Sequence, residues 1–335
     1  MSTLKDIAKY TGFSISTVSY ALNGKGSISD KTAKIIIETA KKLKYNPNGT
    51  IARRLKTGIS NLLGVIVNLD NLVNYSNKIL NILNSLCSKN GYRLIVVHSE
   101  DFAQDISFMK ENKVDGIFYL ATNYIDSSIF LSFKKLDCQI PIVFINCWHK
   151  DYSSSCIRYD EEEAIFDVTS LLIKNKHQHI GCITGEKNWS ATRLRLNGFK
   201  KACRINKLEH NIQNIFYGSY YISNQIYVED HVRELLSRRI SAIVCFNDII
   251  AATVYKIANQ MSIDIPHDLS VTGFDNQLFG SFIFPSLTSI DIPVQKLSES
   301  AFSCLLSKIH HDSSSMDSLI PCEIIERESS SFNRA

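Results

Sequence analysis

The sequence predicts an α/β protein in which a small N-terminal domain of three helices precedes two doubly wound subdomains built on parallel sheets. Two short helical patterns meet at a glycine within the first sixty residues. From Leu62 onward, short apolar runs alternate with helical patterns, which is typical of parallel sheets flanked by helices. An irregular polar break at residues 150–156 interrupts these strand-helix units. The sequence therefore favours two sheets over one.

The N-terminal region has the pattern of a helix-turn-helix. Residues 4–11 and 15–23 each place apolar side chains at i, i+3 and i+4, and Gly12 can take the sharp conformation between them. Either Ser14 or Ser16 can cap the second helix. A third helix follows, whose apolar face would be Ala33, Ile36, Ile37, Ala40 and Leu43. Three such helices form a small core that fixes the second helix in place.

The outer face of the second helix would enter a DNA major groove. It carries Ile15, Ser16, Ser19, Tyr20 and Asn23. Charge supports this interpretation independently, since residues 1–60 hold eleven Lys or Arg against three Asp or Glu, a balance of +8. The whole chain is +4, so the remainder carries −4, as expected if only one end meets phosphates. The alternative is a three-helix domain with a solvated lysine face, or one that docks on another protein.

Five N-terminal segments carry a dense motif. They are Thr3-Leu4-Lys5-Asp6-Ile7-Ala8, Gly12-Phe13-Ser14, Ser16-Thr17-Val18-Ser19, Ala21-Leu22-Asn23 and Tyr45-Asn46-Pro47-Asn48. Together they resemble the signature of the lactose-repressor (LacI/GalR) family of bacterial transcription regulators. The resemblance implies further DNA contacts from Thr3, Leu4, Ser14 and Thr17. Most members have arginine, the usual reader of guanine, at the position of Tyr20, so this chain would prefer a different base there.

Residues 47–60 resemble the hinge of that family. The segment is rich in Gly, Thr and Arg and too short to be stable as an isolated helix. The resemblance implies that it becomes helical on DNA, pairs with the hinge of a dimer mate and wedges Leu55 into the minor groove beside Ala52 and Arg53. The alternative is an ordinary basic linker. The chain has one residue more between Pro47 and Ala52 than the family usually has.

The remaining chain predicts strands and helices in alternation. The candidate strands are Leu62–Val67, Arg93–His98, Gly116–Leu120, Ile142–Ile145, Ile180–Thr184, Ile215–Tyr217, Ala242–Phe246 and Ser270–Phe274. The candidate helices include Lys78–Lys89, Glu161–Asn175, Ala191–Arg204, Val228–Leu236, Ile249–Gln260 and Val294–Ile309. Parallel strands put their carboxyl ends at one edge, where ligands bind.

The family resemblance implies the order of domains. A DNA-binding domain at residues 1–46 and the hinge at 47–60 would be followed by an effector-binding and dimerisation domain at 61–328 and a polar tail at 329–335. As in periplasmic sugar-binding proteins, the chain would cross three times between two lobes. The first lobe would comprise about 61–157 plus 291–318, and the second about 158–288 plus 319–328. Dimerisation would use the first lobe, through residues 72–89 and the helix at 294–309.

Family landmarks in the second half place the candidate effector site. They include Arg193-Leu194-Arg195-Leu196-Asn197-Gly198-Phe199, Phe246-Asn247-Asp248 and Gly273-Phe274-Asp275-Asn276. The resemblance implies that Arg195, Asn247 and Asp275 face a cleft, where a guanidinium, an amide and a carboxylate suit sugar hydroxyls. The apolar side of a ring would be covered by an aromatic side chain such as Trp148, Trp189 or Tyr220, and the first lobe would add Asn68 and Asn146.

Each of these polar residues has a structural alternative. An Asp or Asn after a strand often caps a turn, and an Arg often forms an ion pair within the fold. The chain also has Asp291-Ile292-Pro293 where the family usually has a glutamine. The effector is therefore expected to differ from the sugar of a close relative.

The function predicted from these features is that of a dimeric repressor that a small sugar or sugar derivative releases from operator DNA. The alternative is a regulator whose ligand or protein co-regulator strengthens DNA binding. A more remote alternative is a sugar-binding protein without a DNA role, which would have no use for the basic domain. An enzyme is not expected, because the chain has no Gly-x-Gly-x-x-Gly, phosphate loop or nucleophile elbow.

Cysteine and histidine spacing predicts neither a cofactor nor a metal. The nine cysteines are scattered without a Cys-x-x-Cys pair, which suits reduced, buried thiols. The pairs His177/His179 and His310/His311 have no further ligands at useful spacing. No apolar stretch resembles a signal peptide or reaches transmembrane length, so a cytoplasmic protein without membrane contact is expected.

Overall fold

The computed structural model describes residues 4–23, 28–43, 45, 60–68, 73–99, 101–121, 139–147, 155–311 and 318–330. It divides into two compact units, which are described separately. One comprises residues 1–62 with 113–115, and the other contains the rest of the chain.

In the N-terminal unit, the described residues form three helices around a small core. Helices α1 (Leu4–Thr11), α2 (Ile15–Asn23) and α3 (Asp30–Lys42) confirm the predicted helix-turn-helix, with Gly12 at φ +71° in the turn. Ile7, Val18, Ile36 and Ala40 form the buried centre. Ile37 was expected in this core but is 40% exposed. It lies one residue from Ile36, hence about 100° around the helix, and a three-helix core covers only a narrow stripe.

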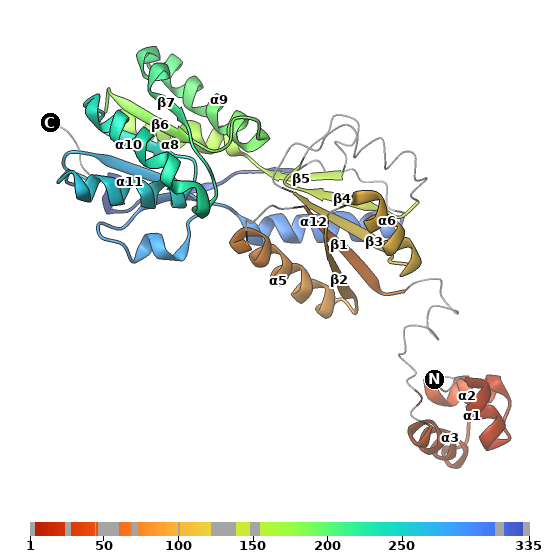
Figure 1. Ribbon diagram of the computed structural model, residues 1–335. Coiled ribbons are helices and arrows are strands. Elements are labelled where there is room, and N and C mark those ends of the chain that lie inside the picture. Colours follow the sequence, from red (N-terminus) through yellow and green to blue (C-terminus); the bar gives the residue numbers. More distant parts are fainter. Residues whose placement is uncertain are drawn as a thin grey trace. The chain divides into compact units, whose positions relative to one another are not determined.

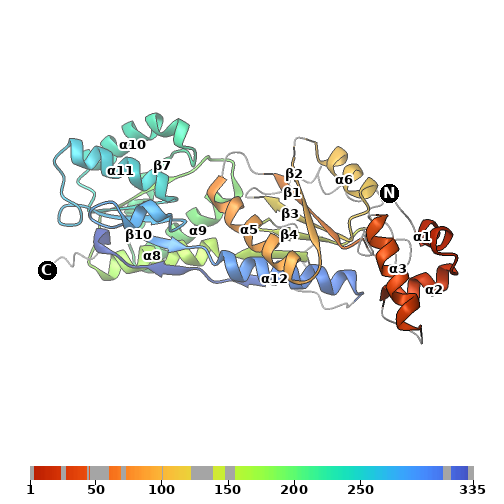
Figure 2. The ribbon, with the colours of Figure 1, turned by 90° about the horizontal axis from the view of Figure 1, so that it is seen from below.

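The first lobe is a six-stranded sheet in the order β11-β5-β4-β3-β1-β2. Its strands are β1 (Leu62–Asn68), β2 (Arg93–His98), β3 (Gly116–Ala121), β4 (Ile142–Ile145), β5 (Cys156–Tyr159) and β11 (Ser318–Ile320). Helices α5 (Val73–Lys89) and α12 (Val294–Ile309) lie side by side on one face, and α6 (Phe102–Glu111) lies on the other (Figures 1 and 2). The fully apolar run of β3, buried at every residue, follows from this cover on both faces.

The second lobe repeats this arrangement in the order β12-β10-β9-β8-β6-β7. Its strands are β6 (Ile180–Thr184), β7 (Ile215–Tyr217), β8 (Ala242–Cys245), β9 (Ser270–Phe274), β10 (Thr288–Asp291) and β12 (Glu323–Ile325). Helices α8 (Glu161–Lys174) and α9 (Ser190–Ile205) pack together, as do α10 (Gln225–Ser237) and α11 (Asp248–Gln260). Gly198 allows α9 to approach α8, because a Cβ there would collide with the carbonyl oxygen of Glu162.

The chain passes between the two sheets three times: after β5, after β10 and between β11 and β12. Within the first sheet β11 pairs with β5 in parallel, whereas β12 pairs with β10 antiparallel in the second. In each lobe the strand order reverses at one point, between β1 and β3 and between β6 and β8. Ligands of open α/β sheets bind beyond the strand carboxyl ends at such points.

All eight candidate strands are confirmed, with ends shifted by no more than one residue. Four strands were not predicted, namely β5, β10, β11 and β12. They have three or four residues each, and β11 and β12 are edge strands. Seven of the eight cysteines that the structure describes are buried free thiols, and Cys322 is partly exposed.

The described residues include neither a membrane-spanning helix nor a cluster of metal ligands. None of the helices in these ranges is long and apolar enough to cross a membrane. Within the same ranges, no three His, Cys, Asp or Glu side chains gather as a metal site would need.

Candidate functional site

The first candidate site is the outer face of α2. The backbone N–H of Thr17 donates to the hydroxyl of Ser14 over 3.1 Å, so Ser14 and not Ser16 caps the helix. Val18 is fully buried and anchors the opposite face, while Ile15 and Tyr20 are 46% and 54% exposed. A helix held by its buried face and presenting an exposed one has the form of a DNA recognition helix.

The other predicted DNA contacts divide into three groups. Ser16 is exposed, and Thr17 and Ser19 are half-buried on the same helix. Leu4 is half-buried and packs against the three-helix core instead of projecting from it. The remaining predicted contacts, Thr3, Ala52, Arg53, Leu55 and the side chain of Asn23, lie outside the described residues.

The second candidate site is a cleft lined from both lobes. Its lining residues are Tyr75, Asn146, Tyr159, Trp189, Ala191, Arg195, Tyr220, Asn247, Asp275 and Ile292. The atom-free space, including the open mouth, is about 400 Å³. The structure thus brings together six of the eight predicted effector contacts. Trp148 and the side chain of Asn68 lie outside the described residues.

Arg195 is buried at the base of the cleft. Its Nε donates to Oε2 of Glu161 over 2.7 Å, and its Nη1 donates to the carbonyl oxygen of Phe246. The guanidinium carbon lies 3.6 Å from the centre of the Phe274 ring. An ion pair, a hydrogen bond and a stacked ring fix the orientation of this side chain.

Asp275 follows β9 in a left-handed conformation, at φ +101°. Its backbone N–H donates to the carbonyl oxygen of Ile290 over 2.9 Å, which holds the turn against β10. Burial raises the pKa of its carboxyl to about 7, against the lowering effect of Arg195. A backbone conformation that costs energy and a pKa displaced by burial together are typical of functional sites.

The turn after Asp275 is supported by a second buried carboxylate. Asp248 accepts hydrogen bonds of 2.6 Å from the hydroxyl of Ser289 and from the backbone N–H of Gln277. Gly273 leaves room for it, because a Cβ there would collide with Oδ1 of Asp248. Burial raises the pKa of Asp248 to about 6. Asp248 therefore supports the turn from behind and does not line the cleft.

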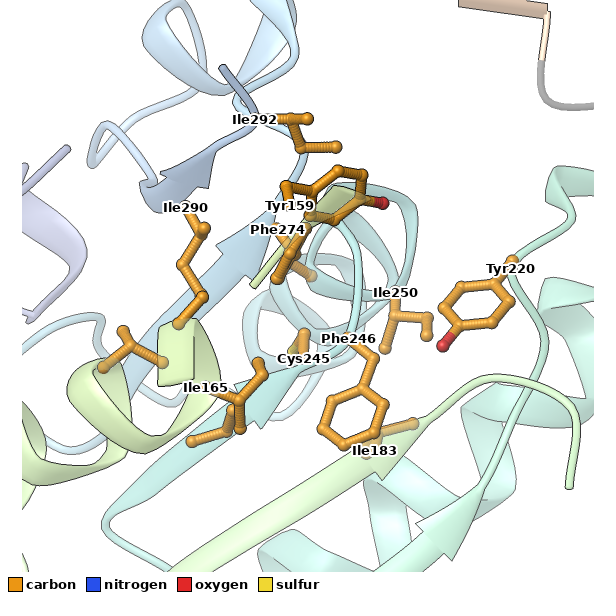
Figure 3. Packing of buried hydrophobic residues seen from close by; sticks show 14 of the residues in the cluster. Tyr159, Ile165, Ile183, Tyr220, Cys245, Phe246, Ile250, Phe274, Ile290 and Ile292 are labelled. Atoms are coloured by element: carbon orange, nitrogen blue, oxygen red, sulfur yellow. The ribbon is translucent and has the colours of Figure 1, made fainter. Parts of the chain in front are cut away.

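Aromatic rings form the walls of the cleft. The ring centres of Trp189 and Tyr220 are 5.4 Å apart, and the Tyr220 hydroxyl is 3.1 Å from that of Thr192. Across the cleft, the ring centre of Tyr159 lies 6.2 Å from the ring centres of both Tyr75 and Phe274. Figure 3 shows Tyr159 beside Phe274 and Ile292, where strands of the two lobes meet. Such walls suit the apolar faces of a sugar or a planar ring.

Two polar groups of the first lobe have hydrogen-bonding capacity to spare. Asn146 is 92% buried, and its Nδ2 has no partner among the described residues. The hydroxyl of Tyr75 has none within the same ranges. Buried donors are normally satisfied, so unpaired ones lining a cleft indicate a ligand that supplies acceptors.

Asn247 serves the fold first. Its Oδ1 accepts from the backbone N–H of Ile250 over 2.9 Å and caps α11, and its Nδ2 donates to the carbonyl oxygen of Tyr220 over 3.2 Å. This is the capping role that the sequence left open as an alternative. Its remaining hydrogen-bonding capacity still faces the cleft.

Sequence reasoning missed four residues that line the cleft, namely Tyr75, Tyr159, Ala191 and Ile292. It also missed Glu161, the partner of Arg195. Tyr159 ends β5 and Tyr75 lies in the first turn of α5, so both belong to the edge where strand carboxyl ends gather. No sequence signal pointed to them, because Tyr159 lies within a strand that was not predicted and Tyr75 lies within a helix. The pairing of Glu161 with Arg195 spans 34 residues and has no signal in local spacing.

Comparison with known proteins identifies the two kinds of domain in this chain. The family profile described as bacterial regulatory proteins, lacI family, matches residues 3–48, and that of the periplasmic binding protein-like domain matches residues 169–330. This chain belongs to the lacI family. The HTH-type transcriptional repressor PurR of Aliivibrio fischeri (strain MJ11) is 28% identical to it over 314 residues, 92% of each protein.

Solved structures of lacI-family proteins share the whole fold. The lac repressor dimer bound to operator and the anti-inducer ONPF superposes with a TM-score of 0.82 at 20% identity, covering 98% of this chain and 99% of that one. The transcriptional regulator CelR in complex with cellobiose has a TM-score of 0.71 at 20% identity and covers 98% and 100%. The predicted fold, with a helix-turn-helix domain before two parallel-sheet subdomains, is confirmed.

Proposed function

We propose that this protein is a transcription repressor that binds operator DNA through α2 and is released from it by a small carbohydrate bound in the cleft. The observation that carries the proposal is the presence, in one lacI-family chain, of an exposed recognition helix and a two-lobed ligand cleft. Its relatives named PurR are repressors. Such a regulator does its work by binding, and the chain is not an enzyme.

Base reading is assigned to the exposed face of α2. Ile15 and Tyr20 are its large side chains, and Ser16 and Ser19 are its small polar ones. The excess positive charge of residues 1–60 supplies the phosphate attraction that holds the helix in the groove. Thr3, Ala52, Arg53 and Leu55 stay predicted contacts of the arm and hinge.

The cleft binds the effector through complementary polar ends. Asn146 and Tyr75 offer donors from the first lobe, and Asp275 offers an acceptor from the second. A polyol, whose hydroxyls both donate and accept, satisfies both ends while its ring contacts Trp189 and Tyr220. CelR, which shares the fold, has been crystallised with cellobiose.

Regulation requires that the effector bind one arrangement of the lobes better than another. The chain passes between the lobes three times, so a ligand contacting both shifts the equilibrium between their relative orientations. If the favoured orientation fits DNA poorly, the effector induces. If it fits DNA well, the effector acts as a co-repressor, which is the second candidate function.

We expect a homodimer, because two recognition helices then read the two halves of a near-palindromic operator. Six of the most exposed large apolar side chains lie in the second lobe: Ile222, Ile226, Tyr227, Leu278, Phe282 and Phe284. The segments that carry them are tied to α11 by the hydrogen bonds of Thr253 to Gln225 and of Tyr255 to Pro285. This apolar surface of the second lobe is a stronger candidate for the dimer contact than α5 and α12.

The protein is expected to act in the cytoplasm, where operator DNA is found.

Selection of bound DNA from a random pool tests the function. The selection is repeated with mono- and disaccharides, phosphorylated sugars and nucleobases. Enrichment of a near-palindrome that one carbohydrate releases is the expected result. Binding that needs an added compound would favour the co-repressor, and a pool without enrichment under any condition would refute the DNA-binding role.

A further inference from the structure

The cleft has one cationic lining residue among those that the structure describes, and that residue is already paired. Arg195 and Glu161 form an ion pair of 2.7 Å in which the two side chains are 5% and 4% exposed. In a buried environment a pair at this distance interacts strongly and carries no net charge. The cleft therefore presents the guanidinium N–H groups without a positive charge to balance an anion.

The pairing is built into the fold. Glu161 is the first residue of α8, and Arg195 lies one turn into α9, the helix that packs against α8. Besides Glu161, the guanidinium contacts the carbonyl oxygen of Phe246 and, over 3.5 Å, the hydroxyl of Tyr159. Each of its three nitrogens thus has a partner within the protein. A ligand that drew Arg195 away from Glu161 would leave a buried carboxylate unpaired.

Asp275 is the only other charged side chain among the lining residues that the structure describes. With Arg195 cancelled by Glu161, its carboxylate gives the cleft a charge between zero and −1. The raised pKa of Asp275, about 7, agrees with a site that supplies little compensating positive charge. The remaining polar groups, Asn146 and the hydroxyl of Tyr75, are neutral.

We propose that Glu161 is a specificity-determining residue, which neutralises Arg195 so that the cleft accepts an uncharged or cationic effector and rejects anionic ones such as sugar phosphates. This inference rests on the proposed function, since it names the class of effector for that same cleft. A phosphate or carboxylate in the cleft would face Asp275 and Glu161 with only Arg195 to balance them. Such ligands should bind at least about 100-fold more weakly than their neutral counterparts.

The test uses inorganic phosphate as the probe and the fluorescence of Trp189 as the readout. Trp189 is one of two tryptophans in the chain and lines the cleft, so the fluorescence of a Trp148→Phe background reports from Trp189 alone. Phosphate is titrated into the full-length protein against chloride at equal ionic strength. The variants are Glu161→Gln, Arg195→Gln, the double variant Glu161→Gln/Arg195→Gln, and Glu163→Gln as the matched control.

Glu163 makes the control closely matched. It lies two residues from Glu161 on the same helix and pairs with Lys201 over 2.7 Å, but at 47% exposure and away from the cleft. We expect no saturable response in the parent or in Glu163→Gln. Glu161→Gln should bind phosphate at least about tenfold more tightly than the parent, because Arg195 then carries an uncompensated charge. The double variant should lose that binding.

Two results would overturn the inference. One is saturable phosphate binding by the parent that Arg195→Gln abolishes, and the other is a folded Glu161→Gln protein that binds phosphate no better than the parent. Because Glu161→Gln breaks a buried pair, its folding is checked by circular dichroism, and the parent titration decides alone if it fails. These failures would leave operator release by a neutral sugar intact, whereas loss of the proposed function would appear in the DNA selection.

Discussion

The carboxylate of Asp115 accepts two hydrogen bonds from Ser60, one from the backbone N–H over 2.8 Å and one from the hydroxyl over 2.9 Å. The same carboxylate accepts the backbone N–H of Asn61 over 2.7 Å. Ser60 is 2% exposed and lies two residues before β1, so Asp115 fixes the backbone just before the first strand of the first lobe. Because the chain runs from the DNA-binding domain through Ser60 into β1, we expect a change of lobe orientation to be transmitted through this point.

Asp115→Ala should therefore weaken the link between effector and operator. We expect effector binding to persist, while the effector-dependent change in operator affinity falls by about 1 kcal/mol, roughly fivefold. Operator titrations with and without effector measure it. Asp101→Ala is the control, because Asp101 accepts two backbone N–H bonds in the same lobe and caps only α6. An unchanged effector response in Asp115→Ala would show that the segment is coupled elsewhere.

Tyr20→Arg should change the base preferred at one operator position. Tyr20 is 54% exposed on α2, and arginine there can donate two hydrogen bonds to guanine. Selection from a randomised half-site library should show a gain of guanine worth about 1–3 kcal/mol. Tyr10→Arg, at a 75% exposed position on α1, adds the same charge and should raise the affinity for DNA without changing the preferred operator sequence. An identical preference in Tyr20→Arg would remove this residue from base reading.

Effector affinity should depend on pH through Asp275. Its pKa is raised to about 7, so the carboxylate that accepts effector hydroxyls forms only as the pH passes that value. Affinity should rise about tenfold from pH 6 to pH 8. Asp275→Asn should flatten this profile and weaken binding throughout. A pH profile that is the same in the parent and in Asp275→Asn would assign the dependence to another group.

The same shift fixes the sign of a stability effect. A folded-state pKa of about 7 lies above the ordinary value of 3.8, so the folded protein binds the proton more tightly than the unfolded chain. The contribution of this group to the free energy of unfolding is present below about pH 4 and is lost as the pH rises towards 7. Asp248, raised to about 6, acts in the same direction. Denaturant unfolding measures this effect: the free energy of unfolding of Asp275→Asn should fall less over this pH range than that of the parent.

Gly198→Ala should destabilise the second lobe. The added Cβ would collide with the backbone carbonyl of Glu162, and a carbonyl in a helix cannot swing aside as a side chain can. We expect a loss of about 1–3 kcal/mol in the free energy of unfolding. Asn197→Ala, beside it on the exposed face of α9, should cost less than about 0.5 kcal/mol. Equal stability of the two variants would mean that the helices separate freely.

Phe282→Glu should convert the dimer to monomers. Phe282 is 79% exposed in the apolar surface of the second lobe, and a carboxylate there would be buried without a partner on association. Sedimentation velocity measures the change. Phe108→Glu makes the same substitution at a 44% exposed position on α6 of the other lobe and should leave the dimer intact. Dissociation by Phe108→Glu alone would move the interface to the first lobe.

Apolar pattern carried most of the fold. A run such as Gly116–Ala121, which is buried at all six positions, predicts a central strand when apolar runs alternate with helical patterns along the chain. β5, with the sequence Cys-Ile-Arg-Tyr, was missed because it follows a polar break and holds an arginine. β11 and β12 are three-residue strands at sheet edges, where pairing partners and not sequence periodicity decide the conformation.

The cleft was predicted where residues follow strands, and missed where they depend on distant partners. Asp275 directly follows β9 and Asn247 lies two residues after β8, so position alone put them near the strand ends. Tyr75 in a helix and Tyr159 in a strand look like ordinary core aromatics. The charge of Arg195 is compensated by Glu161, which lies on another helix and comes near only when the chain folds. Local sequence gives the identity of a group but not its charge compensation.

The two short strands β11 and β12, near residue 320, have a consequence for synthesis. Each adds an edge to a different sheet, so neither lobe is complete until this stretch has left the ribosome. The three-helix domain, by contrast, has its full core within the first 45 residues and can fold as soon as it emerges. A nascent chain therefore has a folded DNA-binding domain well before it can sense effector. A chain truncated before Ser318 would lack β11 and β12 and expose the unpaired edges of β5 and β10. Such a chain would aggregate or be degraded, and it would not act as a repressor that is insensitive to effector.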